Sequence, residues 1–310
     1  MGKIKSNYQK MVRFLTHDIW HLDGTMYGRW KAKGVHYLKV LLITIKGVST
    51  HKTGMQSAAL TFFTLLALVP FMALVYAVTK GFGFAKELES MIYANFSEQE
   101  EAVAWVLRFA NNLLDTGKSG FFGIIGFLTF LWSVVWVMIS VEQIFNHVWQ
   151  VKNDKSVLRK VLIYFALIIF IPVITGGSFL IPLSYKHLIQ NIGWDVKFLS
   201  SLKPVVGWLL HFAYTGTLFF MAFKWIPNTK VRAMPALNAT IFTTVAFVVI
   251  QALYVETQLF VSKLNAIYGA FAALPFFMIW LNTNWFLILL GVEISYAYQN
   301  IDHYGTKKSI

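Results

Sequence analysis

The sequence predicts an all-α protein that crosses a membrane six times, with both termini in the cytoplasm. Three observations predict this class. The 310 residues are 57% hydrophobic and only 13% charged, with a mean hydropathy of +0.58, which is outside the range of ordinary soluble domains. Several apolar segments are about twenty residues long or longer. Lys and Arg are also distributed unevenly between the segments that connect them.

The first apolar segment, 57–78, contains no Asp, Glu, Lys or Arg. A helix of this length rises about 33 Å, which is enough to cross a hydrocarbon core of about 30 Å. Five later apolar segments follow it along the chain. The six predicted spans are 57–78, 121–144, 161–185, 205–225, 236–255 and 267–298.

The distribution of basic residues predicts the orientation of these spans. Nineteen of the 27 Lys and Arg lie before the first span, in alternate loops and in the C-terminal tail, and eight lie in the other loops. Cytoplasmic segments are enriched in Lys and Arg, so both termini are expected in the cytoplasm. The same rule accounts for the net charge of +13, and no nucleic-acid partner is expected.

One membrane domain, 56–300, is predicted between an interfacial segment, 1–55, and a short cytoplasmic tail, 301–310. Within it, 84–118 has apolar residues at helical spacing among acidic ones, which predicts an amphipathic hairpin on the outer face. A further amphipathic helix is predicted at 35–48. It either lies on the inner leaflet or packs under the bundle. Its predicted apolar face consists of Leu38, Leu41, Leu42, Ile45 and Val48.

Three of the spans contain residues that kink or interrupt a helix. Broken helices are tolerated in lipid where the freed backbone groups meet protein or a wet cavity, so they indicate a transport site; kinks that only serve packing are the alternative. The candidates for these kinks are Pro70, Pro172, Gly176, Gly177, Pro182, Gly269 and Pro275.

The sequence contains no pattern typical of an enzyme, a metal site or a cofactor site. His17 and His21 have the spacing of a zincin helix, but Asp18 stands where that motif has Glu, and no third ligand follows. Cysteine is absent, and the carboxylates on the cytoplasmic side are too scattered for a metal-dependent nuclease. No phosphate-binding glycine loop and no G-x-S-x-G motif occurs. We therefore expect no catalytic residues, no bound metal and no cofactor.

Polar side chains within the spans are the remaining candidates for function, because they are costly to bury in lipid. Glu142 and Asn146 are four residues apart at the end of the second span. Asn282 and Glu293 are eleven residues apart, about three helical turns, so they share one face of the sixth span. The alternative for the two acids is that they lie near the inner interface and pair with basic residues of the loops, such as Arg159, Lys230 or Arg232.

Two further polar residues in the fifth span are weaker candidates. Glu256 is seven residues before Lys263 and could pair with it. Gln251 lies deeper, and a hydrogen bond between helices explains it adequately.

Several motifs resemble those of the YihY/BrkB family, bacterial inner-membrane proteins historically labelled ribonuclease BN-like. The similar stretches are SAALTFFTLLALVP at 57–70, IFNHVW at 144–149, PN at 227–228, YG at 268–269 with a following proline at 275, and LGVE at 290–293. The resemblance implies a six-span inner-membrane protein. It also implies a link to envelope integrity, serum resistance and virulence, and to proposed export or lipid transport. It brings no catalytic residue set.

We therefore expect transport or translocation of a small solute or a lipid, through a polar cleft that opens toward the cytoplasm. Glu142, Asn146, Asn282 and Glu293 are expected to line it, and membrane lipids surround it. One alternative is an envelope scaffold that binds protein partners through 84–118. A minor alternative is a membrane-embedded hydrolase or RNA-processing enzyme.

Overall fold

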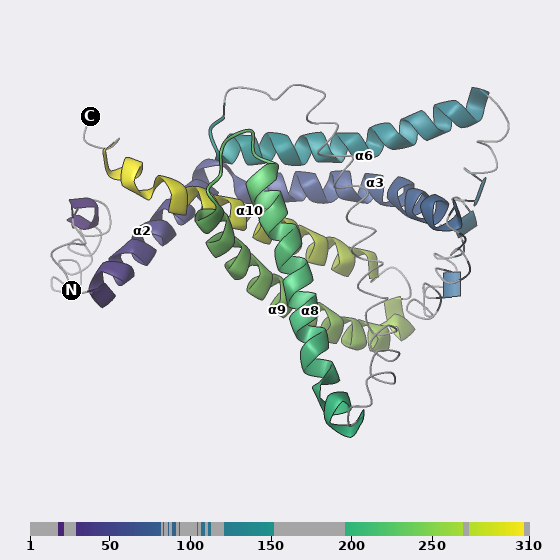
Figure 1. The fold of residues 1–310 in the computed structure, drawn as a ribbon. Helices are drawn as coiled ribbons and strands as arrows, with labels where there is room; N and C mark the ends of the chain where they lie inside the picture. The colour runs from purple at the N-terminus through teal and green to yellow at the C-terminus, as the bar shows by residue number, and fades with distance from the viewer. Residues whose placement is uncertain are drawn as a thin grey trace.

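The computed structural model describes residues 18–21, 29–81, 121–151, 196–268 and 273–306, with single positions between 83 and 112. All regular secondary structure in these parts of the chain is helical, which confirms the all-α class (Figure 1). The elements are the short 3-10 helix η1 (Asp18–His21) and the α-helices α2 (Arg29–Thr50), α3 (Thr53–Gly81), α6 (Phe121–Val148), α8 (Val196–Trp225), α9 (Ala233–Tyr268) and α10 (Ala273–Thr306).

The long helices diverge from one place in the molecule. The start of α3, the end of α6, the end of α8 and the start of α9 come together there, and α10 passes between them (Figure 1). We call this place the junction. From it, α3 and α6 run side by side, α8 packs against α9, and α9 packs against α10. Beyond the junction, α2 and the last turns of α10 extend together on the opposite side.

An apolar core holds the junction together. It takes residues from α3, α6, α8, α9 and α10, so five helices depend on one another at this point. Removing such surface from water stabilises a fold by about 25 cal/mol per Å². The largest fully buried apolar side chains of this core are Leu60, Phe145, Val148, Phe223, Leu289 and Val292.

The outward faces of the same helices are strongly apolar. Large apolar side chains that are about half exposed or more occur on every long helix from α3 to α10. Exposed apolar surface on this scale needs lipid or protein to cover it. Examples are Phe62 and Leu66 on α3, Trp132 and Trp136 on α6, Leu209 on α8, Val249 and Leu253 on α9, and Ile279 on α10.

Within the described residues, two helices are long and apolar enough to cross a membrane by themselves. They are Ala233–Tyr254 in α9 and Pro275–Tyr304 in α10, and a shorter apolar stretch, Thr53–Leu68, lies in α3. The six-span topology therefore stays a prediction. Its third span, 161–185, lies outside the described residues, and so do Pro172, Gly176, Gly177, Pro182 and Gly269.

Two boundaries and one kink differ from the expectation. Helix α9 continues to Tyr268, so 267–268 end this helix and do not begin the next. Helix α8 begins at Val196, nine residues before the predicted span. Pro275 was predicted to kink the sixth span, but it lies in the first turn of α10, where a missing N–H removes no helical hydrogen bond. Helix α3 continues through Pro70 to Gly81.

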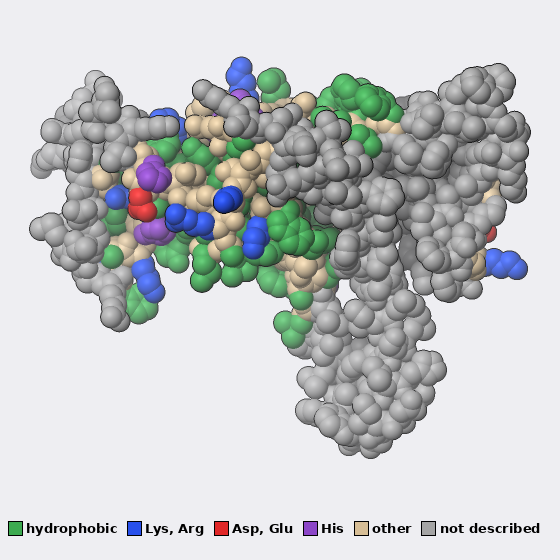
Figure 2. Space-filling model, turned by 45° about the horizontal axis from the view of Figure 1, so that its top comes forward, with side chains coloured by type: hydrophobic (Ala, Val, Ile, Leu, Met, Phe, Trp, Pro, Cys, Tyr) green, Lys and Arg blue, Asp and Glu red, His purple; other side chains and the backbone are tan. Residues whose placement is uncertain are grey.

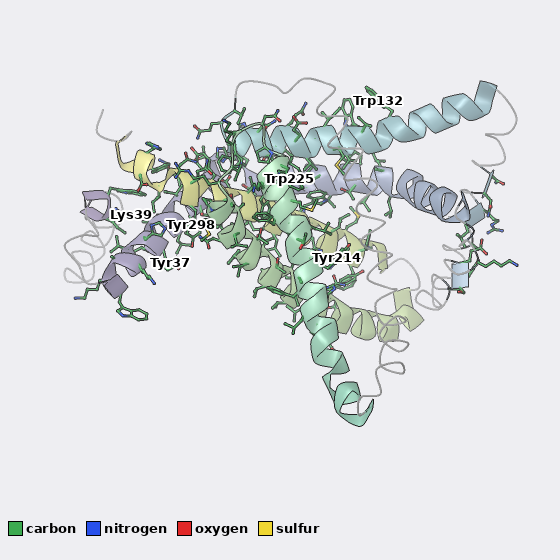
Figure 3. All side chains as sticks on the ribbon, viewed as in Figure 1. Tyr37, Lys39, Trp132, Tyr214, Trp225 and Tyr298 are labelled. Atoms are coloured by element: carbon green, nitrogen blue, oxygen red, sulfur yellow. The ribbon has the colours of Figure 1, made fainter. Side chains whose placement is uncertain are left out.

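The helix predicted at 35–48 exists as part of α2, but its predicted apolar face is not the one that packs. Val40 and Ile43 are buried against Ala297 and Ile301 of α10. Leu41 and Ile45 are 53% and 58% exposed. Thus α2 packs on the protein through one face and leaves its more regular apolar stripe uncovered. Figure 3 shows the packed side, where Tyr37 lies close to Tyr298, with 6.4 Å between the ring centroids.

Most of the predicted outer hairpin, 84–118, lies outside the described residues. The described positions within it are helical, including Lys86, Glu89, Tyr93, Leu107 and Arg108. Leu107 is buried and Arg108 is exposed, as expected for an amphipathic helix.

Candidate functional site

The most deeply buried acid at the junction is Glu293, on α10. Glu293 is 1% exposed, and its Oε1 lies 2.6 Å from Nδ1 of His51. His51 follows the last residue of α2, and its own N–H still donates to the carbonyl of Gly47 at 2.8 Å. Lys52 then adopts a left-handed conformation (φ 51°), which ends the helix and starts the turn into α3. The pair therefore joins the α2–α3 turn to the middle of α10.

Two neighbours restrict this pair. Gly47 faces the Glu293 carboxylate so closely that a Cβ there would overlap it, with 2.8 Å to Cδ. The exposed ring of His147, at the end of α6, meets the His51 ring edge-on, with 5.1 Å between the centroids. Three helices therefore reach the pair, and His147 gives it a neighbour that contacts solvent.

A second polar cluster lies beside it, where α6 meets the α8–α9 loop. The Nδ2 of Asn228 donates to Oε1 of Glu142 at 2.7 Å, and the backbone N–H of Asn228 donates to Oδ1 of Asn146 at 2.7 Å. Glu142 is 3% exposed. The four-residue spacing that places Glu142 and Asn146 on one face of α6 lets both accept from a single loop residue.

The third polar group follows the interface between α3 and α10, which we call the seam: Ser57, Thr61 and Thr64 of α3 with Asn282 and Trp285 of α10. The Nδ2 of Asn282 lies 3.4 Å from the hydroxyl oxygens of both Ser57 and Thr61. The indole N–H of Trp285 donates to Thr64 at 2.9 Å. The small side chains of Ser57, Thr61 and Thr64 thus let α3 and α10 approach closely.

Gln299, one and a half turns beyond Glu293, holds the α8–α9 loop. Its Oε1 accepts from the backbone N–H of Arg232 at 2.7 Å, and its Nε2 donates to the carbonyl of Lys230 at 3.0 Å. The loop is thereby attached to α6 through Asn228 and to α10 through Gln299.

Positive charge gathers around the junction. Figure 2 shows Lys and Arg side chains at this end of the described surface, with histidine and an acid among them. The described basic residues on α2, in the α2–α3 turn and in or near the α8–α9 loop are Lys31, Lys33, Lys39, Lys46, Lys52, Lys224, Lys230 and Arg232. Glu293 is thus paired with a histidine, and Glu142 accepts from Asn228, in a region that also contains Lys and Arg.

The six candidate residues are therefore placed as follows. Asn282 and Glu293 both face the α2–α3 side of the molecule, as their spacing on the sixth span predicted. Glu142 and Asn146 meet at Asn228. Glu256 is exposed on α9. The hydrogen bond expected for Gln251 is not found, since its buried Oε1 has no partner within the described part of the protein.

Several residues that hold these groups together were not among the candidates, including His51, Asn228 and Gln299. Asn228 stands in one of the motifs behind the family resemblance, so the sequence carried a signal for it. His51 follows a basic amphipathic helix, and in this sequence context a buried histidine cannot be distinguished from a solvent-exposed one. The described residues include no group of three or more His, Cys, Asp or Glu placed to hold a metal ion.

Comparison with known proteins identifies the family to which this chain is similar. The model of the family described as virulence factor BrkB matches residues 44–309, which include all three polar clusters. A UPF0761 membrane protein of Acinetobacter baylyi is 28% identical over 269 residues, covering 84% of this chain and 62% of the relative. A UPF0761 membrane protein of Ralstonia nicotianae is 28% identical over 246 residues, covering 77% of this chain and 54% of the relative.

A third relative, a UPF0761 membrane protein of a Psychrobacter species, is 29% identical over 253 residues, covering 79% of this chain and 45% of the relative. The chain thus aligns with about half to three fifths of the length of these relatives. No solved structure matches it. From the matched family model and the apolar outer faces of its helices, the chain is an integral membrane protein that belongs to the BrkB family.

Proposed function

We propose that the protein moves a solute or a lipid across the cytoplasmic membrane, and that it is not an enzyme. The observation that carries this proposal is Glu293, an acid buried within an apolar helix and paired with a titratable histidine. Ionisable residues inside membrane segments are costly, and they typically belong to substrate or ion pathways. A helix with a purely structural role would be more stable with an apolar residue at this position.

The position of the polar groups along α10 supports a pathway. Helices rise about 1.5 Å per residue, so Asn282 lies about 14 Å and Glu293 about 30 Å from the start of α10 at Ala273. In a hydrocarbon core of about 30 Å, Asn282 would stand near the midplane and Glu293 near the inner boundary. Transporters commonly bind their cargo near the midplane, between helices that carry polar groups.

The seam is the part of the interior that can take cargo. Its two contacts from Asn282 are long, at 3.4 Å, and the hydroxyl groups of Ser57 and Thr61 already bond to carbonyls of their own helix. Side chains bound this weakly can exchange partners with a polar headgroup or a solute at little cost. The conformation described here then corresponds to a closed state, in which the polar groups satisfy one another.

The test is native mass spectrometry of the full-length protein, released from membranes in a mild detergent. We expect a lipid or solute to remain bound to the wild type in a fixed ratio. It should be lost from the double variant Glu293→Gln/Asn282→Leu, which keeps the approximate size of both side chains and removes the charge of Glu293 and the hydrogen bonds of Asn282.

A matched control is the double variant Glu256→Gln/Asn238→Leu, which changes an exposed acid and an exposed amide on α9. It should retain the ligand. If the wild type carries no ligand, or if both double variants lose it equally, the seam is not the cargo site and the transport proposal fails.

A further inference from the structure

We infer that the pair His51–Glu293 is a proton-binding site, and that release of its proton opens the seam between α3 and α10. The inference rests on the proposed transport function and adds its coupling to the proton gradient. The argument has four parts: the charge of the pair, its access to water, its attachment to the two helices, and the groups around it.

The first part is charge. With Nδ1 and Oε1 2.6 Å apart, a hydrogen lies between them. If His51 is neutral and donates this hydrogen, the pair carries the net charge of the carboxylate. Binding one proton from water, on either residue, makes the pair neutral overall. Because both side chains are nearly excluded from solvent, at 9% and 1% exposure, the neutral form suits the closed structure.

The second part is access. His51 is buried, but the ring of His147 packs edge-on against it and is itself exposed. An imidazole can accept a proton from water at one nitrogen and release another proton near neutral pH. His147 therefore offers the pair an exposed, titratable neighbour on the side of the junction, where the end of α6 lies.

The third part is mechanical. The pair is the shortest polar contact between the α2–α3 turn and α10, and the contacts of Asn282 farther along the seam are 0.8 Å longer. Release of the proton leaves an uncompensated carboxylate in a buried position, which is unfavourable until water reaches it. The start of α3 must then move away from α10, and this movement exposes Asn282 from the junction side.

The fourth part is the surroundings. No Lys or Arg is paired with Glu293 among the described residues, so no permanent cation replaces the proton. The other titratable or charged side chains on the elements that pack around the pair are Lys46 on α2, Lys52 in the turn, Glu142 and His147 on α6, Tyr296 on α10, and Lys230 and Arg232 in the α8–α9 loop. Of these, Lys46 contacts the ring of Tyr304, and Glu142 accepts from Asn228.

The experiment measures the distance between α3 and α10 as a function of pH. The chain contains no cysteine, so the exposed residues Phe62 and Ile279 can be changed to Cys and labelled without a background. Double electron–electron resonance on the full-length protein in lipid nanodiscs then gives the distance distribution between the labels, measured from about pH 5 to pH 9.

We expect two populations, with the longer distance favoured as the pH rises. Their ratio should change by up to about tenfold per pH unit, which is the limit for one proton. In Glu293→Gln the distribution should stay closed at every pH, because the amide oxygen still accepts from His51 and carries no charge. His51→Asn keeps a donor and leaves Glu293 as the only residue of the pair that can bind a proton, so its response should persist at a shifted pH.

The matched controls are Glu256→Gln and His211→Gln, an exposed acid on α9 and an exposed histidine on α8, which should keep the pH response. The inference is overturned if the wild-type distances do not respond to pH, or if the response persists in Glu293→Gln. Because no cargo is added, a pH response without any co-purified ligand would keep the proton site and remove the transport proposal. A bound ligand without a pH response would keep the transport proposal and remove the proton site.

Discussion

Gly47 illustrates how closely the junction is packed at the level of single residues. Its Cα faces the Glu293 carboxylate, which His51 holds from another side. Glycine lowers helix stability by about 1 kcal/mol relative to alanine, so its presence in the last turns of α2 has a local cost. Glycine occurs here despite this cost because α2 approaches α10 so closely that a larger side chain would overlap the carboxylate.

We predict that Gly47→Ala lowers the melting temperature of the detergent-solubilised protein, by an amount equivalent to about 1–3 kcal/mol, since the added methyl group must displace the carboxylate or the helix. Thermal unfolding followed by tryptophan fluorescence measures it. Gly34→Ala is the matched control on the same helix, because a Cβ there meets nothing within 4 Å. Gly34→Ala should leave the melting temperature unchanged or raise it. Equal effects of the two substitutions would contradict the packing described.

The sequence predicted which acids and amides share a helix face, but it did not predict which residues they contact. Helical periodicity put Asn282 and Glu293 on one face, and the structure agrees, because that arithmetic depends only on local geometry. The partner of Glu293 is 242 residues away in the sequence. Nothing local distinguishes His51 from other histidines near basic segments, so only the packing of α2 on α10 identifies it.

At the scale of helices, the α8–α9 loop shows how one side chain holds a connection. Both hydrogen bonds of Gln299 go to the loop backbone, at Lys230 and Arg232. A loop held only by the chain ends would open often and would expose these two basic residues to a protease.

We predict that Gln299→Leu increases the rate of trypsin cleavage after Lys230 about tenfold or more. Each lost hydrogen bond contributes about 1 kcal/mol, and cleavage follows the population of the open loop. Mass spectrometry of the fragments from native protein measures this rate. Gln143→Leu changes an exposed glutamine on α6 and should leave the rate unchanged. An unchanged rate in Gln299→Leu would show that the loop is held by other contacts.

The positions of the helices followed from hydropathy, whereas their ends and packed faces did not. Hydropathy identifies lipid-facing residues, and in α2 Leu41 and Ile45 of the predicted apolar face remain exposed, whereas Val40 and Ile43, outside that face, contact protein. Helix α9 exceeds the predicted span because its last turns carry Glu256 and Lys263, which lower the hydropathy without disfavouring a helix. A proline near a helix start, such as Pro275, looks the same in sequence as one in a helix interior.

At the scale of the whole molecule, the charges give an orientation that can be tested. Most of the described basic residues lie on α2 or at the junction, where α3 and α9 begin and α6 and α8 end (Figure 2). Under the positive-inside rule, this end lies in the cytoplasm. Helices α6 and α8 both end there, and the predicted six-span topology places one further span, 161–185, between them.

We predict that, in a chain with no other cysteine, Lys230→Cys reacts with a membrane-impermeant maleimide only in inverted membrane vesicles. Glu89→Cys and Asn191→Cys should react only in right-side-out vesicles, since six spans put both on the outer side. Gel mobility after labelling measures this. Labelling of Asn191→Cys only in inverted vesicles would remove the third span and with it the six-span topology.

The packing of α2 on α10 also constrains the order in which the protein can mature. The residues that bury Val40 and Ile43 of α2 are Ala297 and Ile301 of α10, which are synthesised about 250 residues later. Chains grow at about 5–20 residues per second, so the first helix waits tens of seconds or less for its partner. During that interval only the lipid surface or a chaperone can cover it. A chain that stops before Ala297 would therefore leave this face of α2 without its partner on α10.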